Sequence, residues 1–136
     1  MIEAYSKGVD VASNATVPFN NISLLKGCSS TLQGTGTFQL NKCGIYKVHV
    51  SASVEGTAAS TGSIQLRKDG VLMPAAFAAE TITAVDTIYN LGFDTLVQAT
   101  GNNNPNCICS APTNIEVVNT GDDVTFNSVT ITIVRV

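Results

Sequence analysis

The fold is decided most clearly by the stretch that closes the chain, which reads VTFNSVTITIVRV over residues 124–136. Its apolar residues alternate with polar ones, which is typical of a β-strand with one buried face. The core candidates in this stretch are Val124, Phe126, Val129, Ile131 and Ile133. The first two have even numbers and the last three odd numbers, so the alternation slips by one residue at Asn127-Ser128.

This slip predicts a break in the closing strand. A continuous strand over residues 124–136 would span about 43 Å at roughly 3.3 Å per residue, well beyond the usual length. A β-bulge at Asn127-Ser128 would insert one residue and keep all five apolar side chains on one face. A tight turn would explain the slip equally well, and the length of the stretch favours the turn.

A second stretch, IYKVHVSASV at residues 45–54, has the pattern of a central strand. One side carries Tyr46, Val48, Val50, Ala52 and Val54. The other side carries Ile45, Lys47, His49, Ser51 and Ser53. This pattern indicates an antiparallel strand with one face in the core and one face away from it.

Further short strands are indicated at residues 16–19, 37–40, 63–67, 71–73, 81–89, 93–100 and 115–118. Turn signals separate them, among them Asp69-Gly70, residues 90–92 and residues 119–123. No segment has a convincing helical period. The sequence therefore predicts an all-β fold of about eight to ten strands, an antiparallel β-sandwich or jelly roll.

The composition limits the classes of partner that the chain can have. Its 136 residues suit a single domain, 1–136, with 44% hydrophobic and only 12% charged residues. The net charge is −3 and no run of Lys or Arg occurs, which argues against nucleic acid as a partner. No apolar stretch approaches the roughly 20 residues of a membrane span. Residues 1–11 lack the apolar core of a signal peptide, so we expect the mature protein to start at Met1, with this segment as a candidate docking arm.

Four cysteines leave the redox state open. Cys28, Cys43, Cys107 and Cys109 allow three full pairings, which spacing cannot distinguish. Without an export signal, free buried thiols are favoured over disulfides. The spacing and the single histidine argue against a zinc site, and we expect no metal or cofactor.

The residues also resemble a known family. The motif Phe38-Gln39-Leu40 followed by Gly44-Ile45-Tyr46-Lys47-Val48 resembles the core of the C1q/TNF-like jelly roll. The resemblance covers most of the chain, from about Thr16 onward. The hairpin at residues 66–70 and the step at residues 121–124 are similar to those of the family. The ending at residues 129–136 resembles C1q-like domains of bacteriophage structural proteins and bacterial collagen-like surface proteins. Val48 and Val50 stand where vertebrate members carry aromatic residues, which favours the compact prokaryotic and phage form.

This resemblance implies a homotrimer around a three-fold axis, with the Gly-x-Tyr strand and the closing strand at its centre. A low content of charge and many aliphatic residues are consistent with extra buried surface between subunits. The expected interface residues are Tyr46, Val48, Val50, Thr130, Thr132, Val134 and Val136. The last four alternate with Val129, Ile131 and Ile133, which we expect to face the core.

Candidate catalytic groups are sparse. His49 lies on the polar side of its strand, no Gly-x-Ser-x-Gly elbow occurs, and no catalytic residue is expected. Near a three-fold axis, three copies of His49 would form a pH-sensitive cluster, which is a hypothesis. Asp122 and Asp123 are adjacent in a turn, where carboxylates usually cap backbone amides.

These observations favour a non-enzymatic structural or adhesive module. The first interpretation is a phage virion protein, either a capsid decoration, a head fibre or a fibre knob, with capsid or tail proteins as partners on the virion surface. The alternatives are an adhesion domain of a bacterial cell or spore surface and a carbohydrate-binding module that contacts a host glycan. Rigid β scaffolds display ligand-binding groups on loops. The expected ligand-facing residues are Thr57, Ser60, Thr61, Asn102, Asn103 and Asn104.

Overall fold

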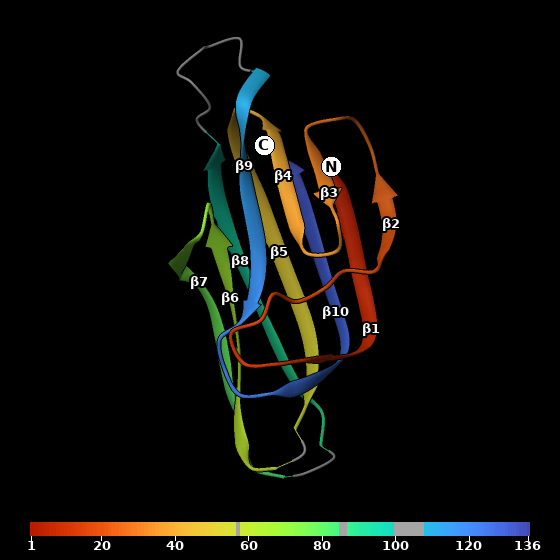
Figure 1. The fold of residues 1–136 in the computed structure, drawn as a ribbon, viewed down its shortest axis with the longest axis vertical. Helices are drawn as coiled ribbons and strands as arrows, with labels where there is room; N and C mark the ends of the chain where they lie inside the picture. The colour runs from red at the N-terminus through yellow and green to blue at the C-terminus, as the bar shows by residue number, and fades with distance from the viewer. Residues whose placement is uncertain (57, 85–86, 100–107) are drawn as a thin grey trace.

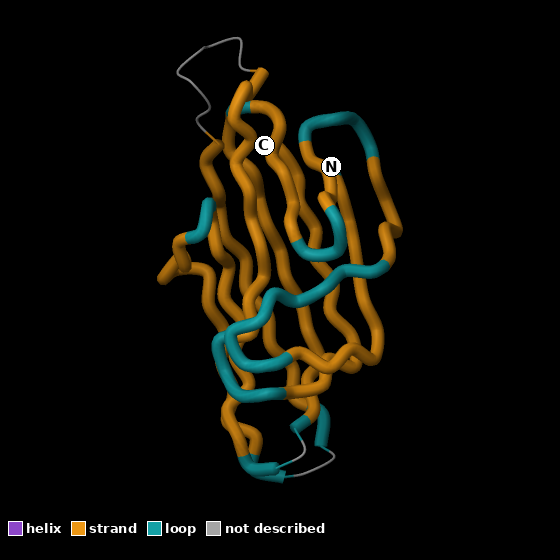
Figure 2. Tube along the Cα trace, in the orientation of Figure 1, coloured by secondary structure: helices purple, strands orange, loops and turns teal. Residues whose placement is uncertain are grey.

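The computed structural model describes residues 1–56, 58–84, 87–99 and 108–136, and these form a sandwich of two antiparallel sheets without helices (Figures 1 and 2). The strands are β1 (Ile2–Val11), β2 (Asn21–Leu25), β3 (Ser30–Gln33), β4 (Thr37–Lys42), β5 (Gly44–Glu55), β6 (Ser60–Lys68), β7 (Val71–Ile82), β8 (Tyr89–Ala99), β9 (Ile108–Asn119) and β10 (Val124–Arg135). One sheet has the order β2-β1-β10-β5-β8 and the other has the order β3-β4-β9-β6-β7. The predicted all-β sandwich is confirmed.

The core lies between the two sheets and is filled from alternate positions of their strands. Tyr46, Val48 and Val50 of β5 are fully buried, as are Phe38 of β4 and Ile64 of β6. The hydroxyl of Tyr46 donates to the backbone carbonyl of Lys42 at 2.6 Å, so this large side chain is buried without an unpaired polar group.

The closing strand β10 is continuous over Val124–Arg135 and lies between β1 and β5. Its register against β5 shifts between Phe126 and Ser128, which is a β-bulge. The bulge keeps both Phe126 and Val129 fully buried on the core face. The expected turn at Asn127-Ser128 was therefore wrong, and the bulge was the correct alternative.

Residues 1–11 are part of the sandwich. β1 pairs with β10 on one side and with β2 on the other, and Ile2 and Ala4 are fully buried. A segment that supplies core side chains and ladder hydrogen bonds on both sides is no detached arm. A docking role for residues 1–11 stays a prediction, and it would have to be performed by this strand of the sandwich.

Strands β7 and β8 begin and end at different residues from those expected. The predicted turn at residues 90–92 lies inside β8, where Leu91 pairs with Ala52 of β5. The chain instead turns after Ile82, where backbone amides of Thr83 and Ala84 donate to the hydroxyl of Tyr89. The sequence over residues 81–89 is rich in β-branched residues, among them Thr81, Ile82 and Ile88, which explains why one strand was predicted there.

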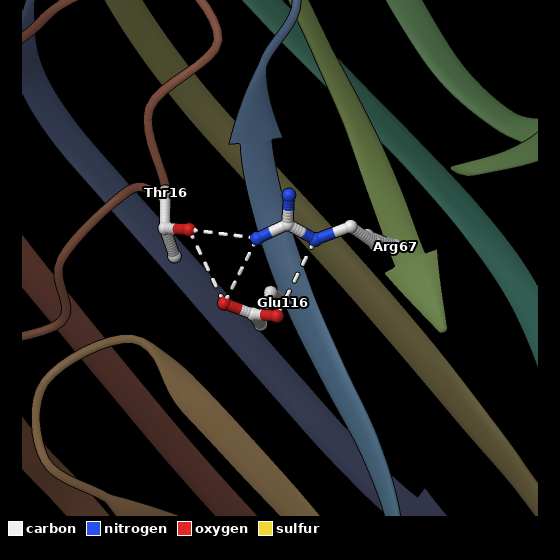
Figure 3. A network of polar contacts seen from close by, with 3 residues as sticks. All are labelled: Thr16, Arg67 and Glu116. Carbon is white, nitrogen blue, oxygen red and sulfur yellow. Dashed lines mark hydrogen bonds and ion pairs between the residues drawn. The ribbon is translucent and has the colours of Figure 1, made fainter. Parts of the chain in front are cut away.

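A strap joins the two sheets between β1 and β2. The amide of Val17 donates to the carbonyl of Val117 at 2.8 Å, and Thr16 forms an isolated bridge with Val118 of β9. The predicted edge piece at residues 16–19 is this strap. Within the strap, the hydroxyl of Thr16 contacts both Arg67 and Glu116, which form an ion pair at 3.1 Å (Figure 3).

The cysteines differ from the favoured expectation. Cys43 is disulfide-bonded, and Cys28 carries a free thiol that is exposed. The expectation of free buried thiols was therefore wrong for Cys43, and for Cys28 it was right about the free thiol and wrong about its burial. Cys43 follows β4 and Cys28 lies in the connection between β2 and β3, at the end of the sandwich that holds both termini (Figure 1).

Candidate assembly surface

The outward face of the sheet β2-β1-β10-β5-β8 is the candidate functional surface, because it presents the residues that alternate with the core. Strand pairing arranges them in rows across β10, β5 and β8. The rows, given in the order β10–β5–β8, are Val134–Lys47–Leu96, Thr132–His49–Asp94, Thr130–Ser51–Gly92 and Ser128–Ser53–Asn90. We call these four rows the assembly face.

Small side chains occupy one half of the assembly face. Thr130, Ser51 and Gly92 form one complete row, and Ser128 and Ser53 continue it in the next. Tyr5 of β1 extends the first of these rows, since it pairs with Thr130. Short side chains in these rows allow another backbone to approach closely.

One titratable pair interrupts this surface. The Nδ1 atom of His49 lies 2.6 Å from the Oδ1 atom of Asp94, and both side chains are at least half exposed. The two residues face each other because β5 and β8 pair them directly. Sequence reasoning singled out His49 but did not pair it with Asp94, since the register between two strands about 45 residues apart cannot be read from their patterns.

Apolar side chains lie at the rim of the assembly face. Leu96 is 62% exposed, and Ile45 and Val136 are exposed beside it at the end of the sheet. A second apolar set, formed by Val71, Leu72 and Phe77, is exposed on β7, the edge strand of the other sheet. Contiguous exposed apolar groups are a feature of surfaces that other chains cover.

The expected interface residues divide into two groups. Thr130, Thr132, Val134 and Val136 lie on the outward side of β10 or directly after it, as expected, and none of them is buried. Tyr46, Val48 and Val50 were wrongly included, because they are fully buried between the sheets and offer no side-chain surface to a neighbour. A β-strand position faces one side only, and theirs is the core.

The expected ligand-facing residues are mostly outside the described residues, namely Thr57, Asn102, Asn103 and Asn104. Ser60 and Thr61 begin β6, and the amide of Thr61 donates to the carboxylate of Asp122 at 2.9 Å. Asp123 accepts from the amide of Ser13 at 2.7 Å. Both aspartates therefore cap backbone amides, as predicted for turn carboxylates.

Within the described parts of the chain, no three His, Cys, Asp or Glu side chains gather closely enough to hold a metal ion. The same parts contain no helix long and apolar enough to cross a membrane.

Comparison with known proteins defines the fold. No protein-family model and no curated protein sequence matches the chain. Eiger TNF from S. frugiperda superimposes with a TM-score of 0.74 at 17% identity, covering 99% of this chain and 92% of that chain. Murine APRIL gives a TM-score of 0.66 at 10% identity, with 99% and 98% covered. The fold is a TNF-like jelly roll.

A viral protein has the same fold. The PRD1 vertex protein P5 superimposes with a TM-score of 0.58 at 14% identity, covering 99% of this chain and 95% of that chain. At such identities the likeness to all three proteins is one of fold, so the assembly face rests on this chain's own residues. The resemblance to the C1q/TNF-like jelly roll is confirmed at the level of the fold.

Proposed function

We propose that the protein is a non-enzymatic structural module that forms a homotrimer and belongs to the surface of a virion, as a capsid decoration, head fibre or fibre knob. The observation that carries this proposal is the assembly face, which combines rows of short side chains with apolar groups at one end that remain exposed in the isolated chain. The solved structures with this fold include a viral vertex protein.

In the proposed trimer the assembly face is the surface that each protomer buries. Thr130, Thr132 and Val134 line it on β10, and Val136 continues it. The exposed apolar set on β7 offers a second, different surface, as a ring of identical head-to-tail contacts requires. Closure of such a ring after three copies removes both apolar sets from water.

The trimer can be tested by measuring the mass of the protein in solution and by placing a charge in the assembly face. Light scattering on the purified chain should give three times its 14.1 kDa mass. Thr130→Arg places a charge in the middle of the assembly face and should yield monomers. Gln39→Arg is the matched control, because Gln39 is also partly buried but alternates with Phe38 and Leu40 on the other sheet. A wild-type monomer, or equal dissociation in both variants, contradicts the trimer.

The proposed place of the protein on a virion surface can be tested by localising the protein. An antibody against the chain should label intact particles made by the host that encodes it, and the chain should co-purify with capsid or tail proteins. Labelling of the bacterial cell or spore surface without particles would instead support the adhesion alternative. Glycan binding by loops without either location would support a carbohydrate-binding module.

A further inference from the structure

Charge is distributed unevenly along the long axis of the sandwich. Four of the seven Lys and Arg residues lie at the end that holds both termini, and we call them the basic end: Lys26, Lys42, Lys47 and Arg135. Lys26 follows β2, Lys42 ends β4, Lys47 lies near the start of β5, and Arg135 ends β10 (Figure 1). The sequence conceals this cluster, because its members are spread over more than a hundred residues.

Carboxylates gather at the opposite end of the same strands. Asp10, Glu55 and Asp123 lie where β1 ends, where β5 ends and just before β10 begins. Tyr46, which pairs with Arg135, is nine residues from Glu55 along β5, or about 30 Å at roughly 3.3 Å per residue. Screening at physiological salt acts over about 8 Å, so the acidic end does not neutralise the basic end despite the net charge of −3.

The cations of the basic end are available for a ligand. The two ion pairs among the described residues, His49–Asp94 and Arg67–Glu116, include none of them. Lys26 and Arg135 are exposed and Lys42 is partly exposed, whereas Lys47 also belongs to the assembly face and would be covered in the proposed trimer. Two carboxylates lie near the basic end: Glu3 pairs with Leu24 and Thr132 and accepts hydrogen bonds from Ser23 and Thr132, and Asp94 shares a hollow with Lys47.

The basic end also has a shape that suits an anionic group. Lys42 and Arg135 line an open hollow of about 400 Å³, together with residues 27–29, Val134 and the two terminal residues Met1 and Val136. Arg135 is held over this hollow by two hydrogen bonds from its guanidinium to the carbonyl of Cys43, at 3.1 and 2.7 Å. The remaining guanidinium N–H groups are left to donate to a ligand.

From this geometry we infer that the basic end binds an anionic polysaccharide, through sulfate or carboxylate groups spaced along the polymer. Lysine ammonium groups are point charges on flexible stems, which suits repeated anions at variable spacing. Tyr46, the aromatic residue beside Arg135, is fully buried, so it cannot serve as a platform for stacking nucleic-acid bases. A cyclic trimer would present three basic ends on one side, and this gain in avidity alone rests on the proposed function.

Heparin, a sulfated polysaccharide, and polyglutamate, a carboxylate polymer, are the probes, with single-stranded DNA as a comparison. We expect the wild-type chain to bind immobilised heparin at about 0.15 M NaCl and pH 7.4, a salt concentration at which unclustered surface charges contribute little. Lys26→Glu with Lys42→Glu should weaken binding at least about tenfold. The matched control is Lys7→Glu with Lys68→Glu, which changes the net charge equally and also combines one exposed with one partly buried lysine, away from the basic end.

The outcomes separate this inference from the trimer. Absence of heparin binding by the wild-type chain, or an equal loss in the control variant, would overturn it. Tighter binding of polyglutamate or single-stranded DNA than of heparin would overturn the assignment of the ligand as a polysaccharide. Light scattering on each variant reports the oligomeric state independently, so heparin binding by a monomer would refute the trimer and leave the basic end intact.

Discussion

Asn119 is a fully buried polar residue that joins three turns of the chain. Its side-chain amide donates to the carbonyls of Val11, Ala12 and Asp122, and its carbonyl accepts from the amide of Gly121. These groups would otherwise be buried or partly buried without partners. A single side chain therefore fixes how the strap, the end of β1 and the β9–β10 turn meet.

Asn119→Ala should lower the free energy of unfolding by about 3 kcal/mol, because it leaves several backbone groups unpaired. Urea denaturation followed by circular dichroism measures the change. Asn20→Ala is the control, because Asn20 is exposed, and it should change stability by less than about 0.5 kcal/mol. Equal effects of the two substitutions would show that Asn119 does not organise the turns.

Tyr89 has a pKa below its ordinary value because hydrogen bonds stabilise the tyrosinate. The side chain of Thr83 is the largest cause, followed by the backbone amides of Ala84 and Thr83. A pKa lowered on folding adds stability only above the ordinary tyrosine pKa, and this contribution is lost as the pH falls through the lowered value. At neutral pH it is absent.

Thr83→Val should therefore raise the pKa of Tyr89 without changing stability at pH 7. Tyrosinate absorbance during an alkaline titration measures this pKa, and Tyr89→Phe identifies its contribution among the three tyrosines. An unchanged titration curve in Thr83→Val would contradict the assigned cause.

At the residue scale, the sequence predicted which side chains are buried better than it predicted their roles. The alternation in residues 45–54 placed Tyr46, Val48 and Val50 in the core, yet the family resemblance led us to expect them at the interface. The partnership of His49 with Asp94 required a register that neither strand pattern contains. The roles of Asp122 and Asp123 followed from turn chemistry, which is local and so was predictable.

At the scale of elements, the bulge in β10 has a counterpart in β1. Lys7 pairs with Ser128 and Val9 with Phe126, so Gly8 lies opposite Asn127 at the bulge. Gly8 has a φ of 64°, in the left-handed region, and a Cβ atom there would meet no other atom within 4 Å. The constraint on this position is therefore one of backbone conformation alone.

Gly8→Ala should cost about 1–2 kcal/mol of stability, since an L-residue is strained at this φ. Gly8→Asn should cost less than Gly8→Ala, because asparagine tolerates the left-handed region. Thermal unfolding of both variants tests the order. A larger loss of stability in Gly8→Asn than in Gly8→Ala would show that the loss arises from side-chain packing and not from backbone conformation.

The strap between the sheets is held by the ion pair of Arg67 and Glu116, whose side chains are 29% and 22% exposed. A double-mutant cycle with Arg67→Met and Glu116→Gln should give a coupling energy of about 0.5–1 kcal/mol. The coupling should shrink at about 1 M NaCl, where screening acts over roughly 3 Å. A coupling independent of salt would assign the effect to the shared contact with Thr16.

Among the elements, β5 and β10 were predictable because their two faces differ in polarity. The short edge strand β2, of sequence NISLL, was missed because all five residues are exposed. A strand without a buried face has no alternation of apolar and polar residues that could reveal it. The bulge was recognisable as one of two alternatives, and only the pairing with β5 decides between them. The limits of β7 and β8 depend on hydrogen bonds to Tyr89 that no local pattern encodes.

At the scale of the whole molecule, the end that carries the termini is also where the disulfide of Cys43 lies. Reduction should lower the free energy of unfolding by about 2–4 kcal/mol, because it releases a constraint on the unfolded chain. Unfolding with and without reductant measures this. Cys28→Ser should leave the difference unchanged, because Cys28 is free, and loss of the difference in that variant would place Cys28 in the bond.

The exposed thiol of Cys28 also offers a chemical handle. It lines the same hollow as Lys42 and Arg135, so a gold particle or fluorophore attached to it marks one end of an elongated molecule. In electron micrographs such a label would reveal which way the sandwich points when it sits on a larger object. The orientation of the protein on such an object could therefore be determined directly from electron micrographs.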